Sequence, residues 1–289
     1  KAWSELRLGR YQGALVSFQL FEKKYPTQFL ISSVHVGRIS AKLRLFRKGN
    51  FRANEIIKEV ESFRKLFPDS SQVQNLYLEL AWALFEKQQF LSALQFATKL
   101  SNRNPLRRVY PISLILEGLC LYHKGEFSKS FGILKRANEL SEYRSFQGEE
   151  RLKEISSLIF SFVAIRLKDY KVAKDTLNSL LSLEKSADKT IKEIASVWLG
   201  EILLLNGKYA RAKDIYSSIS SSSPSYLQSR MGLAWIHFLR EDWEKSANLF
   251  EKTFYSDPFG KFASEALFRS AESKFNLGDY QKAIDTFDR

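Results

Sequence analysis

Only one pair of residues in this sequence has a type and spacing that could support nucleophilic chemistry. Cys120 and His123 lie three positions apart, so on a helix their side chains would share a face and could form a thiolate–imidazole pair. A buried structural cysteine is far commoner than such a pair, and Cys120 is the only cysteine in the 289 residues. We therefore interpret Cys120 as a core residue, and we expect neither an internal disulfide nor a cysteine-rich zinc site.

Motifs for metal or phosphate chemistry are also missing from the sequence. Metal ligands need short spacings, which are not found among the three histidines, His35, His123 and His237. The segment from Gly200 to Gly207-Lys208 has the residue types of a phosphate-binding loop, but its spacing differs and the residues between predict a helix. The sequence therefore predicts a protein that is not an enzyme and that has no cofactor and no metal.

Positive charge is concentrated near the N-terminus. The net charge is +13, and residues 1–50 contain 10 lysines and arginines against two acidic residues. Solvated surface charge, contacts to an acidic partner protein, and contacts to phosphate or lipid headgroups all remain open. Nucleic acid is disfavoured because the basic residues do not follow the whole chain. The candidate basic residues form two groups: Arg38, Lys42, Arg44, Arg47 and Lys48, and then Arg103, Arg107 and Arg108.

No segment of the sequence predicts a membrane span. The longest nearly apolar stretch, Leu158–Ile165, is well short of the roughly 20 residues that a transmembrane helix needs. The sequence begins at Lys1 without an apolar signal region, so the compartment cannot be assigned from a targeting signal.

Small residues recur with a regular spacing along the whole sequence. Each is followed by another small residue 12 positions later, and successive pairs begin 34 to 43 residues apart. Between the two members lies a turn followed by an aromatic residue, as in Gly207-Lys208-Tyr209. The eight pairs are Ala2/Ala14, Ala41/Ala53, Ala81/Ala93, Gly118/Ser130, Ser161/Ala173, Gly200/Ala212, Ala234/Ser246 and Ala271/Ala283.

Each pair predicts a helical hairpin. An apolar run with helical spacing forms the first helix, a residue that tolerates positive φ ends it, and a second helix follows. Small side chains at the crossing let the two backbones approach closely. Prolines that cannot continue a helix follow several of the second helices, namely Pro26, Pro68, Pro105, Pro224 and Pro258. The sequence thus predicts an all-α protein.

This pattern resembles the tetratricopeptide repeat (TPR) family, most clearly from Trp198-Leu199-Gly200 through Tyr209 and Ala212 to Pro224. The resemblance implies a right-handed α-solenoid of about eight TPR-like helical hairpins, the terminal ones truncated. We expect a single solenoid over residues 1–289, as a fragment of a longer repeat protein. Its expected repeats lie near 1–28, 35–68, 74–105, 111–141, 154–184, 193–224, 227–258 and 264–289.

The resemblance also implies a role as a protein–protein interaction scaffold or adaptor, whose concave face is lined by first-helix residues and takes a helix or an extended peptide. The candidate groove residues are Trp82, Phe85, Tyr122, Phe162, Trp235, Phe238 and Phe268, with Leu78, Ile115, Leu119, Leu158, Ile165, Met231 and Phe275 beside them. A second interpretation, that a tightly wound solenoid buries these residues as core, stays open.

The long repeats resemble those of bacterial cell-envelope assembly proteins. We therefore favour a cell-envelope or flagellar motor assembly protein, in the periplasm or envelope rather than the cytoplasm. Two alternatives remain: the substrate-recruiting arm of a larger enzyme, and a solenoid that binds an anionic lipid or nucleic acid.

Overall fold

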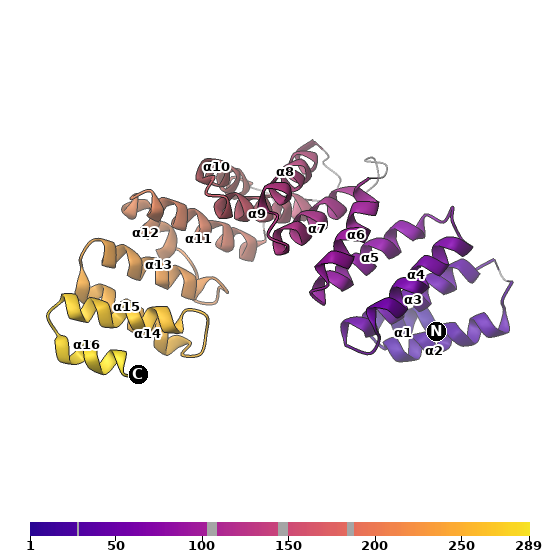
Figure 1. Cartoon of the computed structure of the whole chain (residues 1–289), viewed down its shortest axis with the longest axis horizontal. Coiled ribbons are helices and arrows are strands. Elements are labelled where there is room, and N and C mark those ends of the chain that lie inside the picture. The colour runs from indigo at the N-terminus through magenta and orange to yellow at the C-terminus, as the bar shows by residue number, and fades with distance from the viewer. Residues whose placement is uncertain (28, 103–108, 144–149, 184–187) are drawn as a thin grey trace. The chain divides into compact units, whose positions relative to one another are not determined.

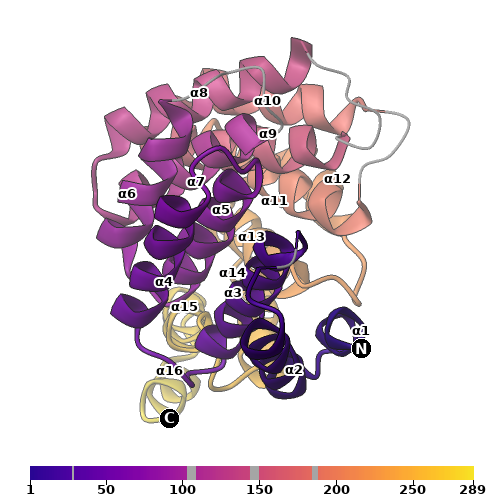
Figure 2. The same cartoon turned by 90° about the vertical axis from the view of Figure 1, so that its right-hand side faces the viewer.

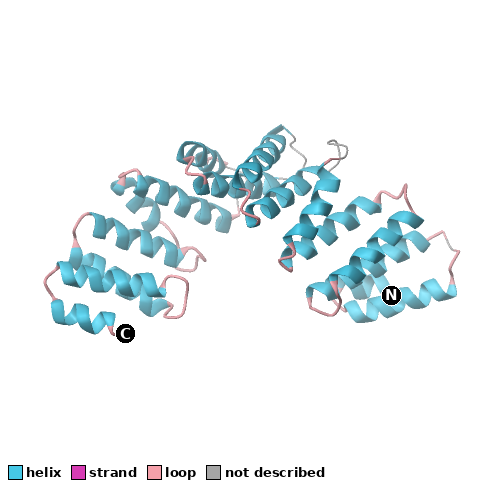
Figure 3. Ribbon diagram, viewed as in Figure 1, coloured by secondary structure: helices cyan, strands magenta, loops and turns pink. Residues whose placement is uncertain are grey.

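The computed structural model describes residues 1–27, 29–102, 109–143, 150–183 and 188–289, and within these ranges the regular structure is entirely helical (Figures 1 and 3). The 16 helices of the described residues are α1 (Ala2–Arg7), α2 (Tyr11–Lys24), α3 (Ile31–Arg47), α4 (Ala53–Leu66), α5 (Gln72–Glu86), α6 (Phe90–Ser101), α7 (Val109–His123), α8 (Phe127–Tyr143), α9 (Glu150–Arg166), α10 (Tyr170–Leu181), α11 (Lys189–Leu205), α12 (Tyr209–Ser217), α13 (Tyr226–Leu239), α14 (Trp243–Ser256), α15 (Ala263–Asn276) and α16 (Tyr280–Phe287). Within the same ranges, no helix combines the length and apolar character needed to cross a membrane.

The chain divides into two compact units, Lys1–Arg144 and Ser145–Arg289. In the N-terminal unit, α1 to α8 form four hairpins, and each second helix packs on the first helix of the next hairpin (Figures 1 and 2). Consecutive first helices also contact one another, from α1 to α3, α5 and α7. The C-terminal unit repeats this arrangement with α9 to α16, where α9 contacts α11 and α11 contacts α13. The fold is the all-α helical repeat solenoid that the sequence predicts.

The recurring small residues lie at the crossings of the hairpin helices. All of them except the partly buried Ala2 and Ala53 are buried. Where serine replaces the second small residue, its hydroxyl donates to the carbonyl of the first one, from Ser130 to Gly118 at 2.7 Å and from Ser246 to Ala234 at 3.4 Å. The buried hydroxyl is therefore satisfied, which explains why serine is accepted at this position.

The turn inside each hairpin uses a left-handed residue to end the first helix. Five of these residues are glycines, but three are not: Gln88, Lys168 and Glu241 have φ values of 58°, 62° and 59°. At the first of them the amide of Gln88 donates to Phe85 at 2.8 Å, and the next amide donates to Leu84 at 2.9 Å. This is the Schellman pattern, so the hydrogen bonding of the helix end holds a conformation that these side chains disfavour.

One tyrosine shows how closely successive repeats pack. Tyr216 on α12 is buried between Gly200 on α11 and Gly232 on α13. A Cβ atom added at Gly200 would lie 2.7 Å from the ring, and one added at Gly232 would lie 2.4 Å from it. Because both neighbours lack a side chain, three helices of two repeats can share one aromatic ring.

Candidate partner-binding faces

In the N-terminal unit, aromatic rings from three helices form a continuous cluster, which we call the N-terminal aromatic cluster. Trp82 contacts Phe85 edge to face at 5.8 Å between ring centroids, and Phe85 lies 5.4 Å from both Phe90 and His123. His123 stacks on Phe90 at 4.3 Å and contacts Tyr122 at 5.5 Å. The cluster joins α5, α6 and α7, so it fixes the side chains that line their surface.

The predicted groove residues of this cluster are neither core nor free surface. Trp82 and Phe85 are partly buried and pack against the main core of the N-terminal unit, and Tyr122 is also partly buried. Ile115, by contrast, is only 2% exposed. Ile115 is therefore a core residue and lines no groove, whereas the three aromatic side chains are only partly buried.

In the C-terminal unit, a second group of side chains gathers on α13 and α15, and we call it the C-terminal face: Trp235, Phe238, Glu265, Phe268 and Arg269. The guanidinium of Arg269 lies 4.7 Å from the centre of the Trp235 ring, 5.7 Å from Phe238 and 5.3 Å from Phe268. These separations are in the range of cation–π attraction. One arginine therefore holds aromatic rings from two consecutive repeats.

The indole of Trp235 is fixed at its polar edge as well. Its Nε1–H donates to Glu265 at 3.1 Å, and its ring meets the buried Phe250 at 5.8 Å. Met231, one turn earlier on α13, is 4% exposed and belongs to the core. Phe268 is 51% exposed. The C-terminal face thus combines a rigid, partly buried base with an exposed aromatic ring.

Phe162 lies on α9 and contacts Trp198 of α11 at 5.2 Å, apart from the other predicted groove residues of the C-terminal unit.

Glu265 and Arg269 were not predicted as site residues. Their spacing with Phe268 and Glu272 follows i, i+3, i+4, i+7, which marks one face of a helix and could have identified them.

Comparison with known proteins bears on the same segment of the C-terminal unit. The profile of the family described as tetratricopeptide repeat matches residues 265–289, which span nearly all of α15 and the whole of α16. Solved structures of TPR proteins resemble the chain in fold over most of its length. Residues 265–289 match the tetratricopeptide repeat family, and the helical hairpins of the chain have the fold of solved TPR proteins.

Three solved structures illustrate the likeness. The apo form of RapI is 11% identical to this chain. The matched region covers 99% of this chain and 83% of RapI, with a TM-score of 0.72. The C-terminal part of a TPR protein from Cytophaga hutchinsonii is 15% identical, with coverages of 92% and 98% and a TM-score of 0.63. A TPR protein from Parabacteroides merdae is 16% identical, with coverages of 93% and 96% and a TM-score of 0.59. No curated protein sequence matches the chain. At these identities the likeness shows the fold alone.

The basic residues of the second repeat are largely paired with side chains of this chain. Arg38 forms ion pairs with Glu22, at 2.8 Å, and with Glu59. Lys42 lies 2.7 Å from the same Glu59 carboxylate, and its pKa is lowered, first by burial and then by Arg38. Most of the charge of these two residues is therefore compensated by glutamates on neighbouring helices, which leaves less of it for a partner.

The remaining basic residues differ in their surroundings. Arg47 pairs with Glu86 at 3.0 Å, and the ammonium of Lys48 lies 5.0 Å above the ring of Tyr11. Arg44 is exposed. The second basic group lies outside the described residues: Arg103, Arg107 and Arg108.

The environment of Cys120 does not suit a nucleophile. Its side chain is fully buried, and burial, followed by the nearby carboxylate of Glu117, raises the thiol pKa to about 12. His123, the potential partner, is exposed and stacks on Phe90. The thiol therefore remains protonated near neutral pH.

Among the described residues, no three His, Cys, Asp or Glu side chains come close enough to hold a metal ion.

Proposed function

We propose that this chain is an interaction scaffold whose C-terminal face captures a segment of a partner protein. The fold suggests protein–protein interaction, and one observation supports this particular face: Arg269 and Glu265 hold the ring of Trp235 in place beside the exposed Phe268. An aromatic surface that is already ordered loses little conformational freedom when it binds.

The composition of the C-terminal face suits a mixed apolar and polar segment. Tryptophan, phenylalanine and arginine are residue types enriched at interface centres and hot spots. The charged groups of Arg269 and Glu265 lie beside the aromatic rings. A partner helix or extended strand can therefore place an apolar side chain on Phe268 and its polar groups near these two charges. The N-terminal aromatic cluster would add a second contact area for the same or another partner.

A pair of phenylalanine variants tests the proposal without disturbing the core. Phe268→Ser changes an exposed residue of the C-terminal face, and Phe259→Ser changes a fully exposed residue of the connection between α14 and α15. We expect affinity capture from the source cells to recover one or more proteins with the parent chain and with Phe259→Ser, but at least tenfold less of them with Phe268→Ser. Equal recovery with both variants would contradict the role of this face.

The proposal includes a bacterial cell-envelope or motor assembly as the setting of the scaffold, and the length of the repeats supports this part. Fractionation of cells that produce the full protein tests it: recovery with envelope fractions is expected, and recovery with the cytoplasm alone would contradict it.

A further inference from the structure

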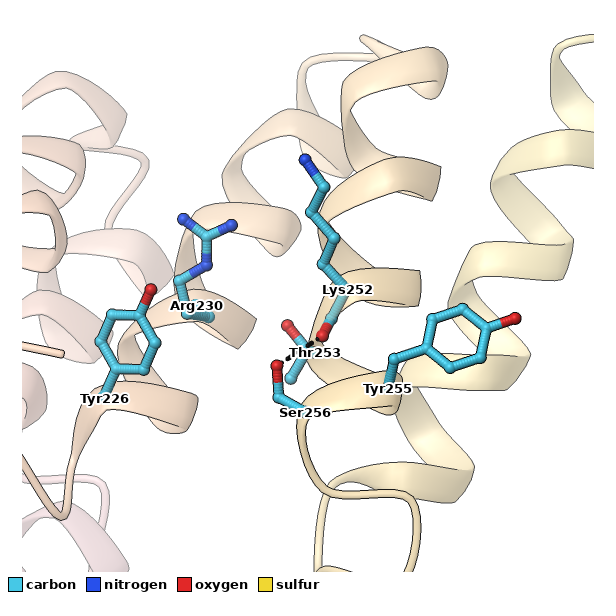
Figure 4. Close-up of a pocket in the computed structure, with 6 residues that line it drawn as sticks. All are labelled: Tyr226, Arg230, Lys252, Thr253, Tyr255 and Ser256. Carbon is cyan, nitrogen blue, oxygen red and sulfur yellow. Dashed lines mark hydrogen bonds between the residues drawn. The ribbon is translucent and has the colours of Figure 1, made fainter. Parts of the chain in front are cut away.

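A pocket of about 340 Å³ lies between the two helices of the seventh hairpin, and it shares no residue with the C-terminal face. Tyr226 and Arg230 of α13 form one wall. Figure 4 shows the side chains of Arg230 and Lys252 extending in the same direction on opposite sides of the gap, with Thr253 and Ser256 between them and Tyr255 turned away. The residues of α14 that line the pocket are Lys252, Thr253, Tyr255 and Ser256.

The two cations of this pocket lack counterions. Neither the Arg230 guanidinium nor the Lys252 ammonium has an ion-pair or hydrogen-bond partner among the described residues, and no acidic residue lines the pocket. Two other cations of the C-terminal unit are compensated: Lys245 lies 2.9 Å from Asp242, and Lys274 lies 3.3 Å from Glu251. Like charges that line one pocket repel each other, so an anion between them would be favourable.

The hydroxyl groups of the pocket complete a set of donors and acceptors. Thr253 donates its proton to the carbonyl of Leu249 at 2.8 Å, and Ser256 donates to the carbonyl of Lys252 at 2.7 Å, so both oxygens keep lone pairs that can accept. The phenol of Tyr226 has no partner among the described residues and can donate. An oxyanion would therefore meet donors from Arg230, Lys252 and Tyr226.

We propose that this pocket binds a phosphate group carried by a small ester or a phosphorylated side chain. A phosphate monoester has a charge of about −1.5 to −2 and three acceptor oxygens, which matches two cations and a phenol better than a singly charged carboxylate does. Any proton that the phosphate keeps can be donated to Thr253 or Ser256. The volume lies at the lower end of the range for small-molecule sites, roughly 300–1,000 Å³, so there is room for the group that carries the phosphate.

Calorimetric titration of the whole chain with three probes tests the proposal: O-phosphoserine, inorganic phosphate, and acetate at matched ionic strength. We expect O-phosphoserine to bind, acetate to give no signal, and binding to weaken as salt is raised. Arg230→Gln and Lys252→Gln should each weaken O-phosphoserine binding at least tenfold. The control variant is Arg240→Gln, because Arg240 is exposed at the end of α13 outside the pocket; it should bind as the parent does.

Each other outcome has a definite meaning. Inorganic phosphate binding as tightly as O-phosphoserine would support the phosphate site and assign the free ion as its ligand. Binding of neither phosphate probe, equal binding of acetate, or an equal loss with Arg240→Gln would overturn the proposal. Since Lys252 is exposed, its substitution leaves the fold intact and keeps the test valid even if Arg230→Gln is unstable.

Discussion

Replacing Gly232 by alanine tests how closely the repeats of the C-terminal unit pack. The added Cβ would lie 2.4 Å from two ring carbons of Tyr216, whereas ordinary carbon contacts are about 3.5–4.0 Å. The ring cannot move away, because Gly200 faces it from the other side. Overpacking of this kind lowers the free energy of unfolding by about 1–3 kcal/mol, whereas the better helix propensity of alanine raises it by about 1 kcal/mol. Because the ring is confined on both sides, we expect a net loss of about 1–2 kcal/mol.

Gly132 provides a matched control on α8. A Cβ added there would meet no atom within 4 Å, so Gly132→Ala has only the gain in helix propensity and should stabilise its surroundings by about 0.5–1 kcal/mol. Hydrogen exchange measured by mass spectrometry is the suitable assay, because repeat proteins open locally. Protection should fall in α11 to α13 for Gly232→Ala and rise in α8 for Gly132→Ala.

A double variant separates the contact from general effects of the new methyl group. Tyr216→Leu removes the ring, so adding Gly232→Ala to it should cost much less than in the parent chain. Unchanged or increased protection with Gly232→Ala alone, or an equal cost in both backgrounds, would refute the packing argument.

Three further predictions concern single features of the two units. Gln88→Gly and Lys168→Gly should each stabilise the chain by up to about 1 kcal/mol in urea unfolding, because glycine adopts the left-handed turn without strain; a loss at both positions would contradict this. Cys120, with its thiol pKa raised to about 12, should not react with a disulfide reagent at pH 8 until the chain unfolds, and rapid labelling of the native protein would disprove its burial. Burial raises the pKa of Glu201, while the hydrogen bond from Gln228 opposes the shift. The ionised form is therefore disfavoured in the folded state, so stability should fall as the pH rises through the folded pKa, and Glu201→Gln should remove this dependence; an identical pH profile would refute the assignment.

Much of the fold could be predicted from the sequence because its causes are local. A small residue at a crossing and a glycine after a helix act within one hairpin, and both are visible as spacing. The turns at Gln88 and Lys168 lie at the same place between the small residues as the glycine turns, and both residues adopt the same left-handed conformation there.

The site residues were harder to predict because their roles depend on neighbours that are distant in sequence. Arg38 stands out in the sequence as one of five clustered cations, but its partners Glu22 and Glu59 come from other helices. Arg269 lies 34 residues from Trp235, and only the packing of α15 beside α13 brings its charge over that ring. Sequence periodicity gives the face of a helix, but not the element that will cover it.

Site-specific photo-crosslinking tests the central functional claim most directly. A photoreactive phenylalanine analogue is placed at Phe268 on the C-terminal face, or at the fully exposed Phe259 as a control, in the full protein in its source cells. We predict that a discrete protein partner crosslinks from position 268 and not from position 259. No crosslinked protein from position 268, or the same products from both positions, would contradict it.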